Sequence, residues 1–151
     1  MNIGIDVGGT NLRAGAVDEE GRLQAKVSVP VGHVESPEAL VRRLAELARQ
    51  AAREAGTPEG EIRAVGVGIP GAVAEGKILY TCNLPLQDVP FEKLFRDGFD
   101  CPVYLENDAN CAAIGEWLYG AGRGLKNFAM ITLGTGLGGG FILNGKPYGG
   151  G

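Results

Sequence analysis

The sequence predicts an α/β fold with a mixed β-sheet and helices on both faces. Three apolar segments joined by short polar turns open the chain, at residues 2–7, 12–18 and 22–31. An amphipathic helical pattern follows them, and segments of strand and helix character then alternate as far as residue 119. A strand meander followed by this alternation is typical of α/β folds with right-handed crossover connections.

The first helix is predicted to begin at Ser36-Pro37-Glu38. Serine is a favoured N-cap, proline fits the first helical position, and glutamate interacts favourably with the positive end of the helix dipole. Gly56 and Pro58 end the helix. One apolar stripe at helical spacing comprises Leu40, Leu44, Leu47, Ala48, Ala51 and Ala55. We expect the charged residues outside it to be solvated, namely Arg42, Arg43, Glu46, Arg49 and Arg53.

Shorter elements are predicted in the rest of the chain. An apolar strand at residues 63–69 runs into Pro70-Gly71, and residues 72–84 have mixed strand and loop character. The remaining patterns predict one or two helical turns at 91–95, a strand at 102–105, a helix at 109–119 that ends at the glycines of 120–124, and a hairpin at 128–143.

Composition excludes several classes of function. The 151 residues carry a net charge of −4, which does not favour nucleic acid or an anionic membrane as a partner. Cys82, Cys101 and Cys111 are an odd count at wide spacings, which favours free thiols in a reducing compartment. His33 is the only histidine. Because there is neither a signal peptide pattern nor an apolar stretch of about 20 residues, we expect a cytoplasmic protein.

The stretch Asp6-Val7-Gly8-Gly9-Thr10-Asn11-Leu12-Arg13 predicts a hairpin turn that binds an anion. Adjacent glycines leave backbone N–H groups accessible, and such groups form anion-binding concavities. Thr10 and Asn11 add side-chain donors and Arg13 adds a positive charge. Asp6 is a candidate to hold Mg²⁺ through water. The alternative is a tight glycine hairpin in which Asp6 only forms the turn.

A second strand–turn–strand unit repeats this pattern at residues 130–143. An offset of 126 residues superposes Asp6 on Thr132 and Gly8 on Gly134, which suggests two related domains. Two such hairpins are expected to close on a polyphosphate from both sides. The spacing Gly134-x-Gly136-x-x-Gly139 also matches a dinucleotide-binding pattern, but a strand follows it where that motif requires a helix.

Asp108 lies where a predicted strand gives way to a helix. One interpretation is an N-cap. The other is a general base for a hydroxyl group, since an aspartate is ionised at pH 7 without special tuning and a helix N-terminus favours the carboxylate. Phosphoryl transfer needs only a mild base, because positioning and charge neutralisation provide most of the catalysis.

Five motifs together resemble the ROK family of sugar kinases and repressors, and most of all its bacterial glucokinases. They are Asp6-x-Gly8-Gly9-Thr10-x-x-Arg13, Gly68-Ile69-Pro70-Gly71, Asn83-Leu84, Glu106-Asn107-Asp108-Ala109-Asn110 and Gly134-Thr135-Gly136-x-Gly138-Gly139-Gly140. The resemblance runs along the whole chain in the order of the family. It implies an actin-like ATPase fold with a ribonuclease H-like sheet in each domain.

The resemblance also implies roles for individual residues. Nucleotide phosphates would contact Gly8, Gly9, Thr10, Asn11 and Arg13 on one side and Gly134, Thr135 and Gly136 on the other. Asp6 would serve Mg²⁺. Sugar hydroxyls would contact Gly71, Asn83 and Asn107. Asp108 would take the proton from the primary 6-hydroxyl of a hexose, most of all glucose, as that oxygen attacks the γ-phosphate of ATP.

Members of the family are about twice as long as this chain. The resemblance therefore implies an N-terminal ribonuclease H-like domain at residues 1–124 and the first hairpin of a second domain at 125–151. The zinc site of the family has no counterpart here, and we expect little activity from this segment alone. Because the hairpin at 128–143 is apolar, we also expect homo-oligomers or self-association through it.

Two alternatives stay open within the resemblance. The sugar could instead be N-acetylmannosamine, fructose or allose. The chain could also belong to a sugar-responsive repressor, although such repressors carry a DNA-binding segment ahead of the first hairpin, whereas here a strand begins at Asn2.

Overall fold

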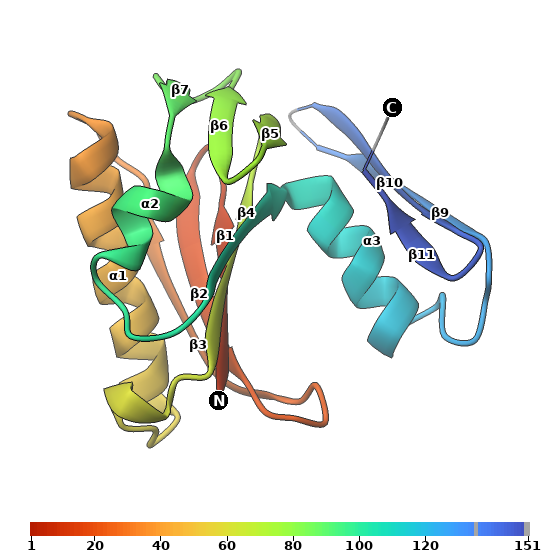
Figure 1. Ribbon diagram of the computed structural model, residues 1–151, viewed down its shortest axis with the longest axis horizontal. Helices are drawn as coiled ribbons and strands as arrows, with labels where there is room; N and C mark the ends of the chain where they lie inside the picture. Colours follow the sequence, from red (N-terminus) through yellow and green to blue (C-terminus); the bar gives the residue numbers. More distant parts are fainter. Residues whose placement is uncertain (135, 150–151) are drawn as a thin grey trace. The chain divides into compact units, whose positions relative to one another are not determined.

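The computed structural model describes residues 1–134 and 136–149, so that Thr135, one of the predicted nucleotide contacts, lies outside the described residues. The chain forms two compact units, residues 1–106 and 107–151, and each is described by itself (Figure 1). The division predicted from the resemblance, at residues 124 and 125, concerns domains of a longer fold and stays a prediction.

The first unit is built on a five-stranded sheet with the order β3-β2-β1-β4-β8. Strand β1 pairs antiparallel with β2 and parallel with β4, which confirms the predicted mixed sheet. The strands and helices of this unit are β1 (Asn2–Val7), β2 (Asn11–Val17), β3 (Leu23–Pro30), α1 (Pro37–Glu54), the 3-10 turn η1 (Glu59–Glu61), β4 (Ala64–Ile69), β5 (Ala72–Ala74), β6 (Lys77–Tyr80), β7 (Gln87–Val89), α2 (Phe91–Arg96) and β8 (Val103–Asn107).

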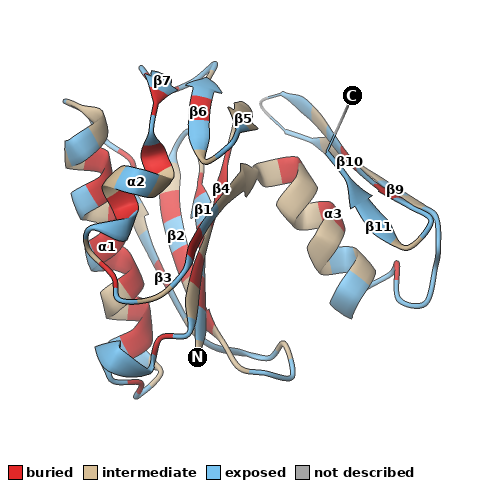
Figure 2. Ribbon diagram, viewed as in Figure 1, coloured by how far each residue is buried: buried red, intermediate tan, exposed pale blue. Residues whose placement is uncertain are grey.

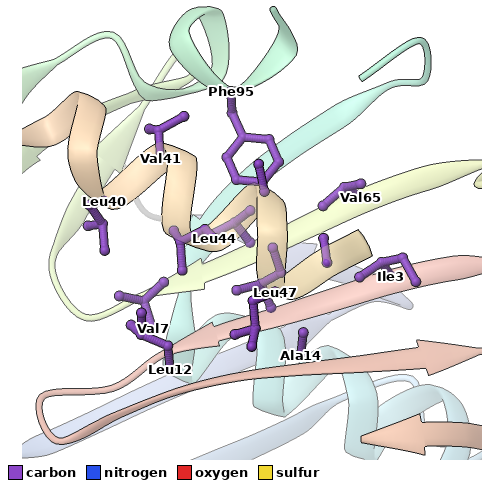
Figure 3. Close-up of a cluster of buried hydrophobic side chains, with 14 of the residues drawn as sticks. Ile3, Val7, Leu12, Ala14, Leu40, Val41, Leu44, Leu47, Val65 and Phe95 are labelled. Carbon is purple, nitrogen blue, oxygen red and sulfur yellow. The ribbon is translucent and has the colours of Figure 1, made fainter. Parts of the chain in front are cut away.

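The core of this unit lies between the sheet and α1. Residues of β1 alternate, so that Ile3, Ile5 and Val7 are buried while Asn2, Gly4 and Asp6 are exposed. In Figure 3, leucines of α1 point toward side chains of β1 and β2. Helix α2 shares this core, and Figure 2 shows its buried residues next to those of α1.

The predicted start and apolar stripe of α1 are confirmed. The Ser36 side chain accepts a hydrogen bond from the Ala39 N–H at 3.1 Å, which caps the helix, and Pro37 is its first residue. The buried residues of the helix are Leu40, Val41, Leu44, Ala45, Leu47, Ala48, Ala51 and Ala52. The helix therefore begins at the predicted residue and buries the predicted apolar face.

The expectation of a solvated charged face on α1 is wrong for two arginines. Arg43 donates to the carbonyl oxygens of Pro30 and Val31. Arg49 donates to the Gly98 carbonyl oxygen at 2.7 Å and lies over the Phe99 ring. Both side chains start at the margin of the buried stripe and are long enough to reach groups beyond it.

The second unit packs helix α3 on an antiparallel sheet with the order β11-β10-β9. Its elements are α3 (Asp108–Tyr119), β9 (Phe128–Leu133), β10 (Leu137–Leu143) and β11 (Lys146–Tyr148). The predicted hairpin is confirmed, with Leu133 opposite Leu137. The same register shows that the glycines after the turn continue as strand β10. A dinucleotide-binding motif would require a helix there, so its rejection is confirmed.

Two glycines of β10 serve packing. A methyl group on Gly140 would lie 2.5 Å from the Ala113 Cβ, and one on Gly138 would lie 2.9 Å from the Ala109 Cβ. Such distances are too short for carbon atoms, so the absent side chains let α3 lie close to the hairpin. The opposite face of the hairpin is apolar and exposed, with Leu133 at 84%, Leu137 at 76% and Ile131 at 67%.

Within the described residues, the structure contains no helix whose length and apolar character suit it to cross a membrane.

Candidate functional site

The turn between β1 and β2 offers two backbone donors. The Gly8 N–H is used within the turn, since it donates to the Asn11 carbonyl oxygen at 3.0 Å. A methyl group on Gly8 would lie 2.7 Å from that same oxygen, so glycine is required there. The N–H groups of Gly9 and Thr10 donate no hydrogen bond within the described residues, and both residues are exposed. They are therefore available to an anion.

Asp6 and Arg13 flank this turn as a cross-strand pair. They occupy directly opposite positions of β1 and β2, and the Arg13 Nη1 lies 3.0 Å from the Asp6 Oδ2. The Asp6 Oδ1 makes no hydrogen bond within the described part of the chain. No group of three or more metal-binding side chains occurs among those residues. One free carboxylate oxygen beside a turn with two free N–H groups fits Mg²⁺, which commonly binds through one or two carboxylates, waters and substrate phosphates.

Two of the predicted sugar contacts belong to the same region of the first unit. A methyl group placed on Gly9 would lie 3.7 Å from the Asn83 Nδ2, so Asn83 lies against the first turn. Gly71 has a φ of 152°, and a side chain there would collide with the Tyr80 carbonyl oxygen and lie 3.0 Å from the Thr81 Cγ2. Gly71 is thus fixed next to the loop that carries Asn83.

Asn107 and Asp108 lie at the junction of β8 and α3. The Asn107 side chain accepts hydrogen bonds from the N–H groups of Ala109 at 3.0 Å and Asn110 at 3.2 Å, so Asn107 is the N-cap. The alternative of Asp108 as the cap is therefore wrong. Asp108 is the first helical residue, half-buried, and its Oδ1 accepts a hydrogen bond from the Ala109 N–H at 2.9 Å. The Asp108 Oδ2 makes no hydrogen bond within the described residues.

The second glycine turn joins β9 to β10 in the other unit. Gly134 and Gly136 are exposed, and the Gly134 N–H donates to the Gly136 carbonyl oxygen at 3.0 Å. This N–H is therefore used within the turn, unlike those of Gly9 and Thr10.

Arg43 is a residue near the first turn that the sequence interpretation missed. Its Nη2 donates to the Pro30 carbonyl oxygen at 2.8 Å and its Nη1 to that of Val31. The Val31 N–H in turn donates to the Thr10 carbonyl oxygen at 2.8 Å. A signal was available, because position 43 follows Leu40 by three residues and precedes Leu47 by four, which places it at the edge of the buried stripe.

Residues 2–151 match the ROK family. The chain belongs to the ROK family. This ROK chain is 40% identical over 148 residues to a glucokinase from Streptomyces coelicolor, and the match covers 97% of the chain and 44% of that protein. It is 37% identical over 149 residues to an N-acetyl-D-glucosamine kinase from Salmonella paratyphi C, covering 97% and 48%.

The ROK fold predicted from the motifs is confirmed by a solved structure. The crystal structure of a ROK family glucokinase from Streptomyces griseus, in complex with glucose and AMPPNP, aligns with a TM-score of 0.88 at 37% identity. The alignment covers 99% of this chain and 46% of that one. The chain therefore spans a little under half the length of each of these relatives.

Proposed function

We propose that this ROK chain forms part of an ATP-dependent hexose kinase. The observation that carries the proposal is the exposed turn at Gly9 and Thr10, where two backbone N–H groups have no partner among the described residues and Asn83 lies alongside. Donors for phosphate beside an amide suited to a hydroxyl are what a sugar kinase needs at one place. The similarity to a glucokinase solved with glucose and AMPPNP supports this assignment.

The first turn is assigned to the nucleotide phosphates. The free N–H groups of Gly9 and Thr10 donate to phosphate oxygens, with Gly8 providing the close backbone approach, while Asn11 and Arg13 add polar and positive groups. Asp6 would hold Mg²⁺ through water, and the ion would neutralise charge on the transferred phosphoryl group when bound. Gly134 and Gly136, with Thr135 between them, form a second set of phosphate contacts.

Asp108 is assigned as the general base. Its carboxylate accepts the proton of the 6-hydroxyl while the hydroxyl oxygen forms a bond to the γ-phosphorus and the bond from that phosphorus to the bridging oxygen of ADP breaks. The products are a hexose 6-phosphate, ADP and a proton. The Asp108 Oδ2 is the free acceptor atom, because Oδ1 is occupied by the Ala109 N–H. A positioned base contributes on the order of 10²–10⁴ in rate.

Glucose is the leading sugar, with Gly71, Asn83 and Asn107 as its contacts in this chain. The glucose complex of the Streptomyces griseus glucokinase supports glucose as the substrate. The similarity to the N-acetyl-D-glucosamine kinase from Salmonella makes an amino sugar an alternative substrate. Kinases for N-acetylmannosamine, fructose or allose remain alternatives on the same scaffold. A sugar-responsive repressor has no use for free phosphate donors, so the first turn favours the kinase.

A coupled assay of ADP release tests the proposal with glucose, mannose, fructose, N-acetylglucosamine and N-acetylmannosamine. It is run on the 151-residue chain and on a longer protein that carries it. We expect turnover by the longer protein, fastest with glucose, and little from the chain alone. Absence of ADP release from the longer protein with every sugar would overturn the assignment.

A further inference from the structure

Thr10 and Val31 form an incomplete pair at the end of the β2–β3 ladder. The register places Asn11 opposite Pro30, so Thr10 lies opposite Val31. In an antiparallel ladder, two residues of a hydrogen-bonded pair exchange both of their N–H···O bonds. Here the Val31 N–H donates to the Thr10 carbonyl oxygen at 2.8 Å, but the return bond from the Thr10 N–H to the Val31 oxygen is not made.

Arg43 donates to the oxygen that would accept the missing bond. Its Nη1 donates to the Val31 carbonyl oxygen and its Nη2 to the Pro30 oxygen at 2.8 Å. Arg43 is half-buried and forms no ion pair within the described residues, so its guanidinium is committed to these two backbone groups. A planar guanidinium donates to two acceptors from a fixed fork, which a lysine ammonium cannot reproduce.

We propose that Arg43 is a positioning residue for the nucleotide: it caps the Val31 carbonyl and thereby keeps the Thr10 N–H free for a phosphate oxygen. The inference rests on the proposed function, which assigns the turn to phosphates. Arg43 does not itself touch the ligand. It acts from α1 by satisfying the oxygen to which the Thr10 N–H would otherwise donate, and it leaves the Val31–Thr10 bond in place to hold the turn.

Amide hydrogen exchange on the full 151-residue chain tests the capping directly, without nucleotide. In the wild type the Thr10 amide is expected to exchange fast. In Arg43→Gln the Val31 oxygen is uncapped, so the Thr10 amide is expected to exchange about tenfold more slowly, the effect of one added hydrogen bond. The control is Arg42→Gln, which removes an exposed neighbouring arginine that makes no hydrogen bond within the described chain. Equal Thr10 exchange in all three proteins would overturn the inference.

Nucleotide affinity tests the consequence for phosphate binding. With Mg²⁺ present, Arg43→Gln is expected to weaken AMPPNP by about tenfold and to change AMP by less than about twofold, since only the longer phosphate chain reaches the turn. The affinity of Arg43→Lys for AMPPNP is expected to lie between those of the wild type and Arg43→Gln. If Arg43→Gln folds poorly, the lysine variant still tests the inference. Equal loss for AMPPNP and AMP would indicate a merely structural residue and overturn the inference. The affinities are measured in a longer protein that carries this chain. If that protein binds no nucleotide with residue 43 as arginine, the proposed function fails, while the exchange experiment on the 151-residue chain still decides the role of Arg43 in capping.

Discussion

Asp6 and Arg13 face each other across the first hairpin, with the Arg13 Nη1 3.0 Å from the Asp6 Oδ2. The pair leaves the second carboxylate oxygen of Asp6 without a partner in the described chain. About half of each side chain is exposed. The pair is therefore better placed to orient a carboxylate than to stabilise the fold.

Replacing either member of this pair should separate binding from stability. Asp6→Asn and Arg13→Gln should each lower the free energy of unfolding by no more than about 1 kcal/mol, because exposed ion pairs contribute little. Asp6→Asn should in addition remove the Mg²⁺ dependence of AMPPNP binding, measured by calorimetry with and without the metal. Asp18→Asn, which removes a carboxylate outside the glycine turn, is the control for the Mg²⁺ dependence of binding. An unchanged Mg²⁺ dependence in Asp6→Asn would exclude Asp6 as the residue serving the metal.

Substitution of Asp108 should lower the catalytic rate, whereas substitution of Asn107 should lower the stability of the fold. In a longer protein that carries this chain, Asp108→Asn should lower kcat by about 10²–10⁴ while the Kd for the sugar stays within about threefold. Asn107→Ala removes the helix cap and should lower the free energy of unfolding by about 1 kcal/mol. Asp97→Asn, at an exposed carboxylate of the first unit, should leave kcat unchanged. Near-normal turnover by Asp108→Asn would show that another group accepts the proton.

Adjacent glycines of β10 provide a matched test of packing. A methyl group on Gly140 would lie 2.5 Å from the Ala113 Cβ and 2.8 Å from the Ala109 carbonyl oxygen, whereas the nearest atom to one on Gly139 is 3.5 Å away. Gly140→Ala should therefore destabilise the protein by about 1–3 kcal/mol in chemical denaturation, and Gly139→Ala by much less. Similar losses in the two variants would mean that α3 does not lie against Gly140 in solution.

Acid should weaken the β2–β3 turn through Asp18. The backbone N–H of Arg22 donates to this carboxylate at 2.8 Å and, with the Arg22 and Gln24 side chains, lowers the pKa of Asp18 below its ordinary value near 3.8. A lowered pKa in the folded state stabilises the protein above the ordinary value, and this contribution is lost as the pH falls through the lowered one. Asp18→Asn should thus reduce the loss of stability between about pH 5 and pH 2. An identical pH slope in wild type and variant would contradict this.

The exposed face of the hairpin should associate. We expect the 151-residue chain to form dimers or larger species at micromolar concentration, because Ile131, Leu133 and Leu137 form an apolar patch beside an edge of the sheet. Leu133→Lys combined with Leu137→Lys should give a monomer in light scattering, and Leu23→Lys, at an exposed leucine of the first unit, should not. A monomeric wild type would rule out this surface as a site of self-association.

The local elements were predictable because their signals are local. Ser36 and Pro37 fixed the start of α1, and the apolar stripe of that helix matches its buried face. The glycine turn was predicted as a hairpin and is one. The cap of α3 was not predicted, because Asn107 and Asp108 are both good capping residues and only the backbone direction decides which side chain meets the free N–H groups. Gly138 and Gly140 were grouped with the turn motif, although glycine is needed there because a side chain would collide with α3.

The sequence by itself determined the family, the mixed sheet and which residues are candidates to bind phosphate, because motifs, periodicity and caps lie within short stretches of the chain. Only the tertiary structure decided that Asn83 lies against Gly9 and that Arg43 holds the Val31 carbonyl. Such contacts join residues far apart in sequence, and they depend on the packing of α1 and of the loop after β6 against the sheet. That packing leaves the Thr10 N–H free.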